Sequence, residues 1–145
     1  MSNTAGSTDA SLPVPSLIVG LRLSGKKAAV FGNGQSATNR ALFALDAGAD
    51  VVMYALSAPS SLGKWVESGR LSLVSPEKYS ASDMSAFSVA FIADSAPVDQ
   101  QAIAYDAQAA GVPINVAGVT ALSDFALMPT YRGSSSLQIA VTTNG

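Results

Sequence analysis

Short, largely apolar runs alternate with amphipathic stretches along most of the chain. A run of four or five apolar residues bounded by turn residues is typical of a strand that is buried on both faces of a sheet. The sequence therefore predicts strands at 28–31, 51–55, 71–74, 89–93 and 113–116.

Helical spacing of apolar residues separates several of these strands. After residue 35 the apolar positions recur every three or four residues, at Ala37, Ala41, Ala44 and Leu45. This spacing predicts a helix that ends at a left-handed cap formed by Gly48. Further helices are predicted at 61–67, where Trp65 would be a packing residue, and at 97–110, which has Pro just inside its start and Gly just past its end.

Strands that alternate with helices predict an α/β fold with a mainly parallel, right-handed, doubly wound sheet. The last part of the chain differs, because apolar stretches at 125–131 and 137–143 flank a turn rich in glycine and serine. These stretches are predicted to form either a hairpin or two C-terminal edge strands. We expect residues 1–15 to be a disordered leader and residues 16–145 to form one domain.

The composition narrows the classes of function. Hydrophobic residues make up 48% of the 145 residues and charged residues 12%, and the net charge is −2. The few basic side chains are scattered, so no nucleic-acid partner is expected. Because the chain has no Cys and no His, it cannot form thiolate or imidazole metal sites or a Ser-His nucleophile. We expect no metal site, and any acid or base must be Asp, Glu, Lys or Tyr.

The sequence also indicates a cellular location. No apolar run approaches the roughly 18 residues of a membrane span, and residues 1–11 lack the basic and apolar regions of a signal peptide. We therefore expect a cytoplasmic protein without a membrane partner.

A glycine-rich string lies between the first predicted strand and the first predicted helix. The residues Gly32-Asn33-Gly34-Gln35-Ser36-Ala37 fit the pattern G-x-G-x-x-A. In that pattern the first glycine permits a tight turn, the second permits the backbone to approach a pyrophosphate, and the small third residue permits close packing of helix on strand. Amides at the helix N-terminus then hold the phosphates. The sequence thus predicts a Rossmann-type domain, although a glycine turn that only packs remains the alternative.

An acidic residue is missing from the second strand. A NAD site usually carries Asp or Glu at the end of that strand to hold the ribose hydroxyls, whereas here Leu56 and Ser57 follow it. Asp50 precedes the strand and should point away from the site. The ribose contact would fall to Ser57 or to backbone groups, and NADP is not favoured because no Arg lies there.

The stretch from Leu17 to Gly145 resembles the N-terminal dehydrogenase domain of siroheme synthases, the family of precorrin-2 dehydrogenases and sirohydrochlorin ferrochelatases. The likeness is carried in order by the opening LIVGLRLSGKKAAVFGNGQSATNRALFALDAGADV and by the segments WVESGRLSLV, VAFIADSA, PINVAG and SDFALMPTYRGSSSLQIAVTTNG. The resemblance implies that NAD accepts hydride from precorrin-2 to give sirohydrochlorin, and that some members insert ferrous iron in the same cleft.

The resemblance extends the candidate cofactor site beyond the glycine-rich string. It adds the segment after the second strand and the end of the fourth strand, where the nicotinamide would lie. The complete set of candidate cofactor-binding residues is Gly32, Gly34, Gln35, Ser36, Ala37, Leu56, Ser57, Ala93 and Asp94. Asp94 and Ser95 have an alternative interpretation as a plain cap of the helix at 97–110.

The chain departs from the family at the candidate catalytic base. The family motif N-V-x-D reads Asn115-Val116-Ala117-Gly118 here, and a glycine cannot take a proton. Asp124 matches an acid of some members and is the remaining catalytic candidate, with a cap or turn residue before Phe125 as its alternative role.

Family members continue beyond this length into a region that dimerises and binds substrate, so we expect a homodimer only when that region is present. Arg40 and Arg132 are the candidate contacts for the carboxylates of the tetrapyrrole. Two functions remain open: NAD-dependent oxidation of precorrin-2, and a non-catalytic nucleotide-binding or structural module of a multidomain tetrapyrrole-biosynthesis protein. A generic nucleotide sensor would need an acid after the second strand.

Overall fold

The structure is a computed structural model that describes residues 15–94, 97–134 and 136–142. The chain divides into two units. The larger unit is Arg22–Ala126, and the smaller unit combines the residues before Arg22 with those from Leu127 onwards. Each unit is described by itself.

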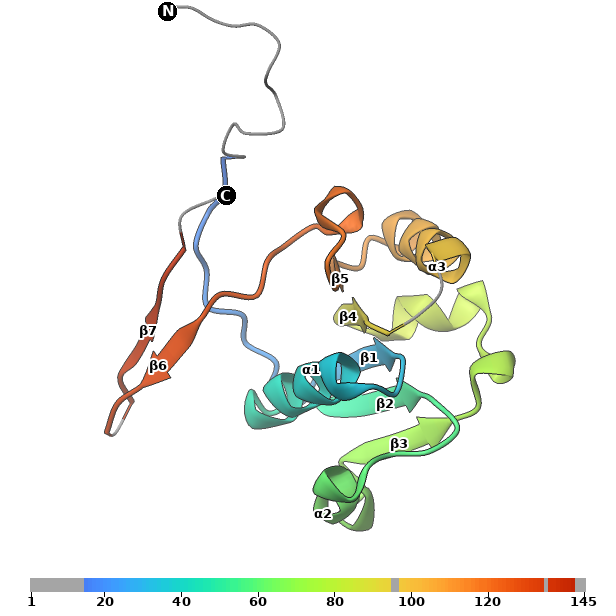
Figure 1. Ribbon diagram of the computed structural model, residues 1–145, viewed down its shortest axis with the longest axis horizontal. Helices are drawn as coiled ribbons and strands as arrows, with labels where there is room; N and C mark the ends of the chain where they lie inside the picture. The colour runs from blue at the N-terminus through green and yellow to red at the C-terminus, as the bar shows by residue number, and fades with distance from the viewer. Residues whose placement is uncertain (1–14, 95–96, 135, 143–145) are drawn as a thin grey trace, which may run out of the picture. The chain divides into compact units, whose positions relative to one another are not determined.

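Parallel strands form the sheet of the larger unit (Figure 1). Their bounds are Lys27–Phe31 for β1, Asp50–Tyr54 for β2, Leu71–Val74 for β3, Val89–Ile92 for β4 and Ile114–Val116 for β5. The order across the sheet is β3-β2-β1-β4-β5, and every neighbouring pair is parallel. The predicted strands and the parallel doubly wound sheet are therefore confirmed.

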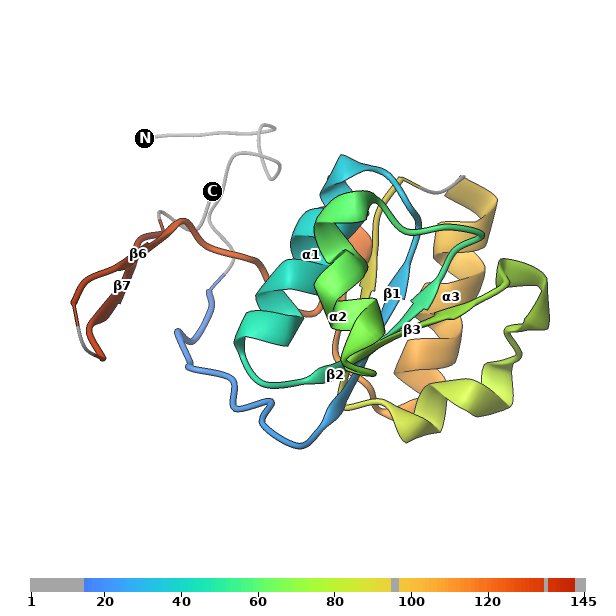
Figure 2. The same cartoon turned by 90° about the horizontal axis from the view of Figure 1, so that it is seen from below.

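Helices cover both faces of this sheet. Figure 2 shows α1 (Gln35–Asp46) and α2 (Gly63–Glu67) on one face and α3 (Pro97–Ala110) on the other. The predicted cap of α1 is confirmed, since Gly48 has a φ of 94°. Short 3-10 turns join the elements at Ser60–Leu62 (η2), Pro76–Lys78 (η3), Ala81–Ala86 (η4) and Thr120–Leu122 (η5). The last three were not predicted from the apolar pattern.

The core has one layer on each side of the sheet because successive side chains of a strand point to opposite faces. In β1, Ala28 and Val30 pack with the small residues of α1, whereas Ala29 and Phe31 pack toward α3. All four residues of β4 are buried in the same alternating manner. Burial on both faces explains why these strands are continuous apolar runs in the sequence.

Aromatic rings hold the carboxyl ends of β1 and β2 on the α3 side. Phe31 and Tyr54 stack with their centroids 4.7 Å apart, and Tyr79 meets both rings edge-on. The Tyr79 hydroxyl donates to Asp106 of α3 at 2.9 Å. Burial, followed by the bond to Asp106, raises the pKa of Tyr79, so this phenol stays protonated and keeps donating at neutral pH.

In the smaller unit, strands β6 (Thr130–Arg132) and β7 (Gln138–Ala140) form a separate antiparallel sheet. The predicted hairpin is confirmed, and the alternative of two edge strands on the main sheet is wrong. An antiparallel partner needs only a tight turn, whereas a further parallel strand needs a crossover of a dozen or more residues. All residues of both strands are exposed.

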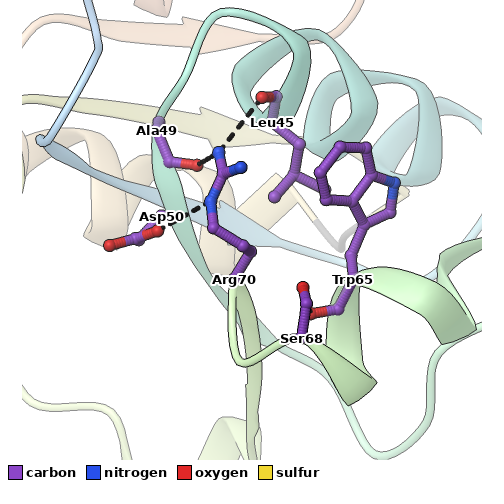
Figure 3. Close-up of polar contacts among 6 residues, drawn as sticks. All are labelled: Leu45, Ala49, Asp50, Trp65, Ser68 and Arg70. Carbon is purple, nitrogen blue, oxygen red and sulfur yellow. Dashed lines mark hydrogen bonds and ion pairs between the residues drawn. The ribbon is translucent and has the colours of Figure 1, made fainter.

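Arg70 joins the end of α1 to the start of β2, at the amino end of the sheet (Figure 3). Its Nη2 donates to the carbonyl oxygens of Ala49 at 2.7 Å and Leu45 at 3.2 Å, and its Nε lies 2.9 Å from Oδ1 of Asp50. The guanidinium also lies 5.4 Å from the centroid of the Trp65 ring. Asp50 is thus held at the end of β2 opposite to the glycine-rich loop, as predicted.

The carbonyl contacts of Arg70 should matter more than its ion pair. Replacing Arg70→Met removes the side-chain donor of the Ala49 carbonyl oxygen and one of the two donors of the Leu45 carbonyl oxygen, which keeps the Gly48 amide. This loss should lower the free energy of unfolding by about 1–3 kcal/mol. Replacing Asp50→Asn should cost less than about 1 kcal/mol, because an exposed ion pair contributes little. Urea unfolding followed by the fluorescence of Trp65 measures both values, and equal losses would show that the ion pair dominates.

Candidate functional site

The glycine-rich loop lies where the direction of strand progression reverses. From β1 the chain proceeds outward to β2 and β3, and then returns to place β4 on the other side of β1 (Figure 1). In open α/β sheets, ligands bind at the carboxyl ends of the strands beside such a switch point. Gly32 follows β1 directly and Ala93 follows β4 directly, so both candidate segments lie at this position.

Gly32 makes the closest approach between the two segments. Its φ is 120°, and a Cβ atom at this position would overlap the carbonyl oxygen of Ala93. The same Cβ would lie 3.4 Å from the Cβ of Ala37, the buried small residue in the first turn of α1. The loop therefore has no room for a side chain between α1 and the end of β4.

The first turn of α1 presents backbone amides at this point. The Thr38 amide donates to the carbonyl oxygen of Gly34 at 3.0 Å, and the Thr38 hydroxyl donates to the same oxygen at 2.9 Å. In the part of the chain that the structure describes, the amides of Gln35 and Ser36 have no hydrogen-bond partner. Two donors at the positive end of a helix of 12 residues favour an anion there.

Asp94 occupies the third amide of this turn. Its Oδ2 accepts a hydrogen bond from the Ala37 amide at 3.0 Å, across 57 residues of sequence. Asp94 has a φ of 56°, which is unusual for a residue with a side chain. The carboxylate thus caps α1, while the predicted cap of α3 by Asp94 and Ser95 stays a prediction because Ser95 lies outside the described residues.

Arg40 brings a positive charge to the same turn. Its Nη1 donates to the Ser36 hydroxyl at 2.6 Å and its Nε donates to the side-chain oxygen of Asn115 at 3.0 Å. Burial lowers the pKa of Arg40, and the charge of Asp94 opposes that shift. Asn115 is buried and donates in turn to the carbonyl oxygen of Phe125.

The hydrogen bonds of Arg40 concern one residue that was predicted for the site and one that was not. In this structure Nη1 and Nε of Arg40 bind Ser36 and Asn115, and the predicted contact of Arg40 with substrate carboxylates stays a prediction. Asn115 was noted only as part of a motif, and its contact with Arg40 was not predicted. A polar residue in the otherwise apolar strand β5 was the available signal, because a buried amide needs partners.

Leu56 and Ser57 follow β2, the strand beside β1, and both side chains are exposed. Their position is that expected for a ribose contact at the carboxyl edge of the sheet. Within the described residues, no group of three or more acidic side chains that could hold a metal ion occurs.

The region after β5 contains the two positions considered for a catalytic base. Gly118 has a φ of 74° and forms part of a turn closed by a hydrogen bond from the Val119 amide to the carbonyl oxygen of Val116. Of the residues that the structure describes, none has an atom within 4 Å of a Cβ built at Gly118. Left-handed backbone at the third position of a turn is typical of glycine and is tolerated by Asn or Asp.

Asp124 has a structural partner. Its Oδ2 accepts from the Ile114 amide at 3.0 Å, and its own amide donates to the Ile114 carbonyl oxygen at 2.7 Å. Through these two hydrogen bonds Asp124 pairs with Ile114 at the start of β5, much as a residue of a neighbouring strand would. The geometry therefore supports the turn role of Asp124 rather than that of a base.

Comparison with solved structures finds a similar fold in SirC, a precorrin-2 dehydrogenase. The TM-score is 0.67 at 20% sequence identity, over 88% of this chain and 62% of that one. The chain thus spans less than two thirds of the length of that protein. The predicted resemblance to the N-terminal domain of siroheme synthases is confirmed at the level of fold.

No curated protein sequence matches the chain. Within the described residues, no helix is both long enough and apolar enough to cross a membrane.

A family model described as "Putative NAD(P)-binding" matches residues 19–128, which include the glycine-rich loop, Asp94 and Gly118. The chain therefore belongs to this NAD(P)-binding family.

Proposed function

We propose that the chain binds NAD with the pyrophosphate at the N-terminus of α1. The observation that carries this proposal is the pair of amides, Gln35 and Ser36, that have no partner among the described residues and lie beside the narrow turn at Gly32. Membership of an NAD(P)-binding family supports it. The amides and the positive end of the helix dipole suit a phosphate better than a neutral ligand.

The remaining candidate residues suit the other parts of the cofactor. Ser57 offers a hydroxyl to the ribose at the end of β2, where a carboxylate is missing from the sequence. No Arg lies in the sequence directly after β2 to receive a 2′-phosphate, which supports NAD over NADP. Ala93 and Asp94 lie across the switch point at the end of β4, so the cofactor would meet them between its pyrophosphate and its nicotinamide.

The reaction we propose is the oxidation of precorrin-2 to sirohydrochlorin. The likeness of fold to SirC and the family membership support an oxidoreductase. When bound, NAD would accept the hydride. The chain itself would orient the cofactor through Gln35 and Ser36 and leave the exposed turn at Gly118 open to water. Since Gly118 cannot take the accompanying proton, solvent would receive it. Insertion of ferrous iron remains a prediction from the resemblance.

A second candidate function is NAD binding without turnover, within a larger tetrapyrrole-biosynthesis protein. The contacts of Asp124 favour it, because the Ile114 amide already engages this carboxylate. Gly118, the other position considered for a base after β5, has no side chain that could take a proton. If the chain is instead a dehydrogenase, its catalysis would depend on the orientation of cofactor and substrate alone, which can provide much of the rate of a hydride transfer.

Removing one amide tests the phosphate site. Gln35→Pro deletes the N–H at the first position of α1, where proline is well tolerated, and Gly34 before it is extended with φ −82° and ψ −170°, as proline requires. We expect NAD to bind the wild-type chain and to bind Gln35→Pro about tenfold more weakly. Calorimetric titration measures both affinities.

Gln35→Ala is the matched control, because it removes the side chain and keeps the amide. Among the described residues its side chain forms a hydrogen bond to Asn39 only, so NAD affinity should stay within about twofold of wild type. Absence of NAD binding to the wild-type chain at millimolar concentration would refute the proposed function. Equal affinity in the proline variant would place the pyrophosphate elsewhere.

Gly118 tests the reaction. Gly118→Asp should raise the rate of precorrin-2 oxidation with NAD, because it restores a proton acceptor where open space surrounds the Cβ. Gly118→Asn, which suits the same left-handed backbone but takes no proton, should leave the rate unchanged. Both variants should lose about 1 kcal/mol of stability relative to glycine. Sirohydrochlorin absorbance follows the rate, and no turnover in any variant would favour the second candidate function.

A further inference from the structure

The carboxylate of Asp94 lies in the space where a phosphate would approach the backbone. A Cβ built on Gly34 would lie 2.5 Å from Oδ2 of Asp94, so the carboxylate is directly over the second glycine of the loop. The same oxygen accepts the Ala37 amide at 3.0 Å. In the G-x-G-x-x-A pattern that glycine is the point of closest approach to the pyrophosphate. The carboxylate and a phosphate would therefore meet at the same surface.

We propose that Asp94 competes internally with the phosphates of the cofactor and thereby limits the affinity of the site. This inference rests on the proposed function of the loop, and it adds a specific determinant of cofactor affinity. With the Ala37 amide occupied by Asp94, the first turn of α1 offers a ligand the amides of Gln35 and Ser36 only. A pyrophosphate gains the third amide when the carboxylate moves away.

The negative charge of Asp94 adds electrostatic repulsion to its competition with a phosphate for the Ala37 amide. Asp94 is negative, as is the pyrophosphate, and two like charges a few ångströms apart repel each other. α1 has no acidic residue of its own in its first turn, so Asp94 is the anion that the helix end receives in this structure. Arg40 lies near enough for the charge of Asp94 to act on it, and its positive charge would attract whichever anion is present.

The position of the Asp94 carboxylate allows it to move away from the Ala37 amide. Asp94 is exposed, so its side chain can turn into water without the cost of moving a charge through the core. Its left-handed backbone, with φ at 56°, directs the side chain back over Gly34. An alternative role is a cap that only stabilises α1, and that role predicts no gain in affinity when the charge is removed.

Asp94→Asn separates the two roles, because Asn keeps the shape, tolerates left-handed backbone and still offers an oxygen to Ala37. We expect Asp94→Asn to bind NAD and inorganic pyrophosphate about tenfold more tightly than wild type, and adenosine equally well. The gain should decrease as salt is raised, because screening weakens charge repulsion. Calorimetric titration of the three ligands measures this.

Asp46→Asn is the matched control. Asp46 is an exposed residue at the other end of α1, so the variant has the same change in net charge far from the loop. It should bind all three ligands as wild type does. In the wild-type chain, pyrophosphate should also shift the ¹H–¹⁵N resonance of Ala37 along with those of Gln35 and Ser36, because the Asp94 contact is lost.

The outcomes distinguish this inference from the proposed function. Equal or weaker NAD binding by Asp94→Asn, with normal binding by wild type, would overturn the inference and leave the function standing. Tighter pyrophosphate binding by Asp94→Asn with no NAD binding by either chain would support the inference and refute the function. No binding of either ligand to either chain would refute both, and an equal gain in Asp46→Asn would overturn the inference in favour of net charge.

Discussion

The close contact between Gly32 and the end of β4 is the constraint on which the site depends. Because the Ala93 carbonyl oxygen occupies the place of a Gly32 side chain, the chain can leave β1 and start α1 directly against the next strand. That approach puts the first turn of α1 at the edge of β4 and leaves two amides without partners in the described part of the chain. It also brings Asp94 within hydrogen-bond distance of Ala37. One steric condition thus creates both the candidate anion site and its internal competitor.

The charges around this contact form a balanced set at one end of α1. The helix end is positive through its dipole, Arg40 adds a cation held by Ser36 and Asn115, and Asp94 supplies the anion. The amino end of the sheet is secured separately, by Arg70 and its carbonyl contacts. The residues that stabilise the amino end of the sheet and the residues that would bind a ligand at its carboxyl end can therefore change independently, because binding residues lie on loops that a rigid scaffold positions.

Cofactor binding and catalysis place different demands on the chain. Binding needs backbone amides and a narrow turn, which are properties of local geometry and survive many side-chain changes. Proton transfer to the protein needs one carboxylate at one position, and here Gly118 and the engaged side chain of Asp124 leave that position without one. The fold is accordingly more informative about the ligand than about the reaction.

The helices of the larger unit and the strands of its sheet are predictable from the amino-acid sequence, because burial on both faces makes continuous apolar strands and because Gly32, Gly34 and Ala37 are the residues that a close turn requires. The position of Asp50, at the end of the sheet away from the loop, is predictable in the same way. The choice between a hairpin and edge strands for the last residues needed the folded structure, since pairing partners are not encoded in periodicity. The contact of Asp94 with Ala37 and that of Arg40 with Asn115 join residues 57 and 75 positions apart. Such contacts follow from the order of strands in the sheet, and no local pattern along the chain specifies them.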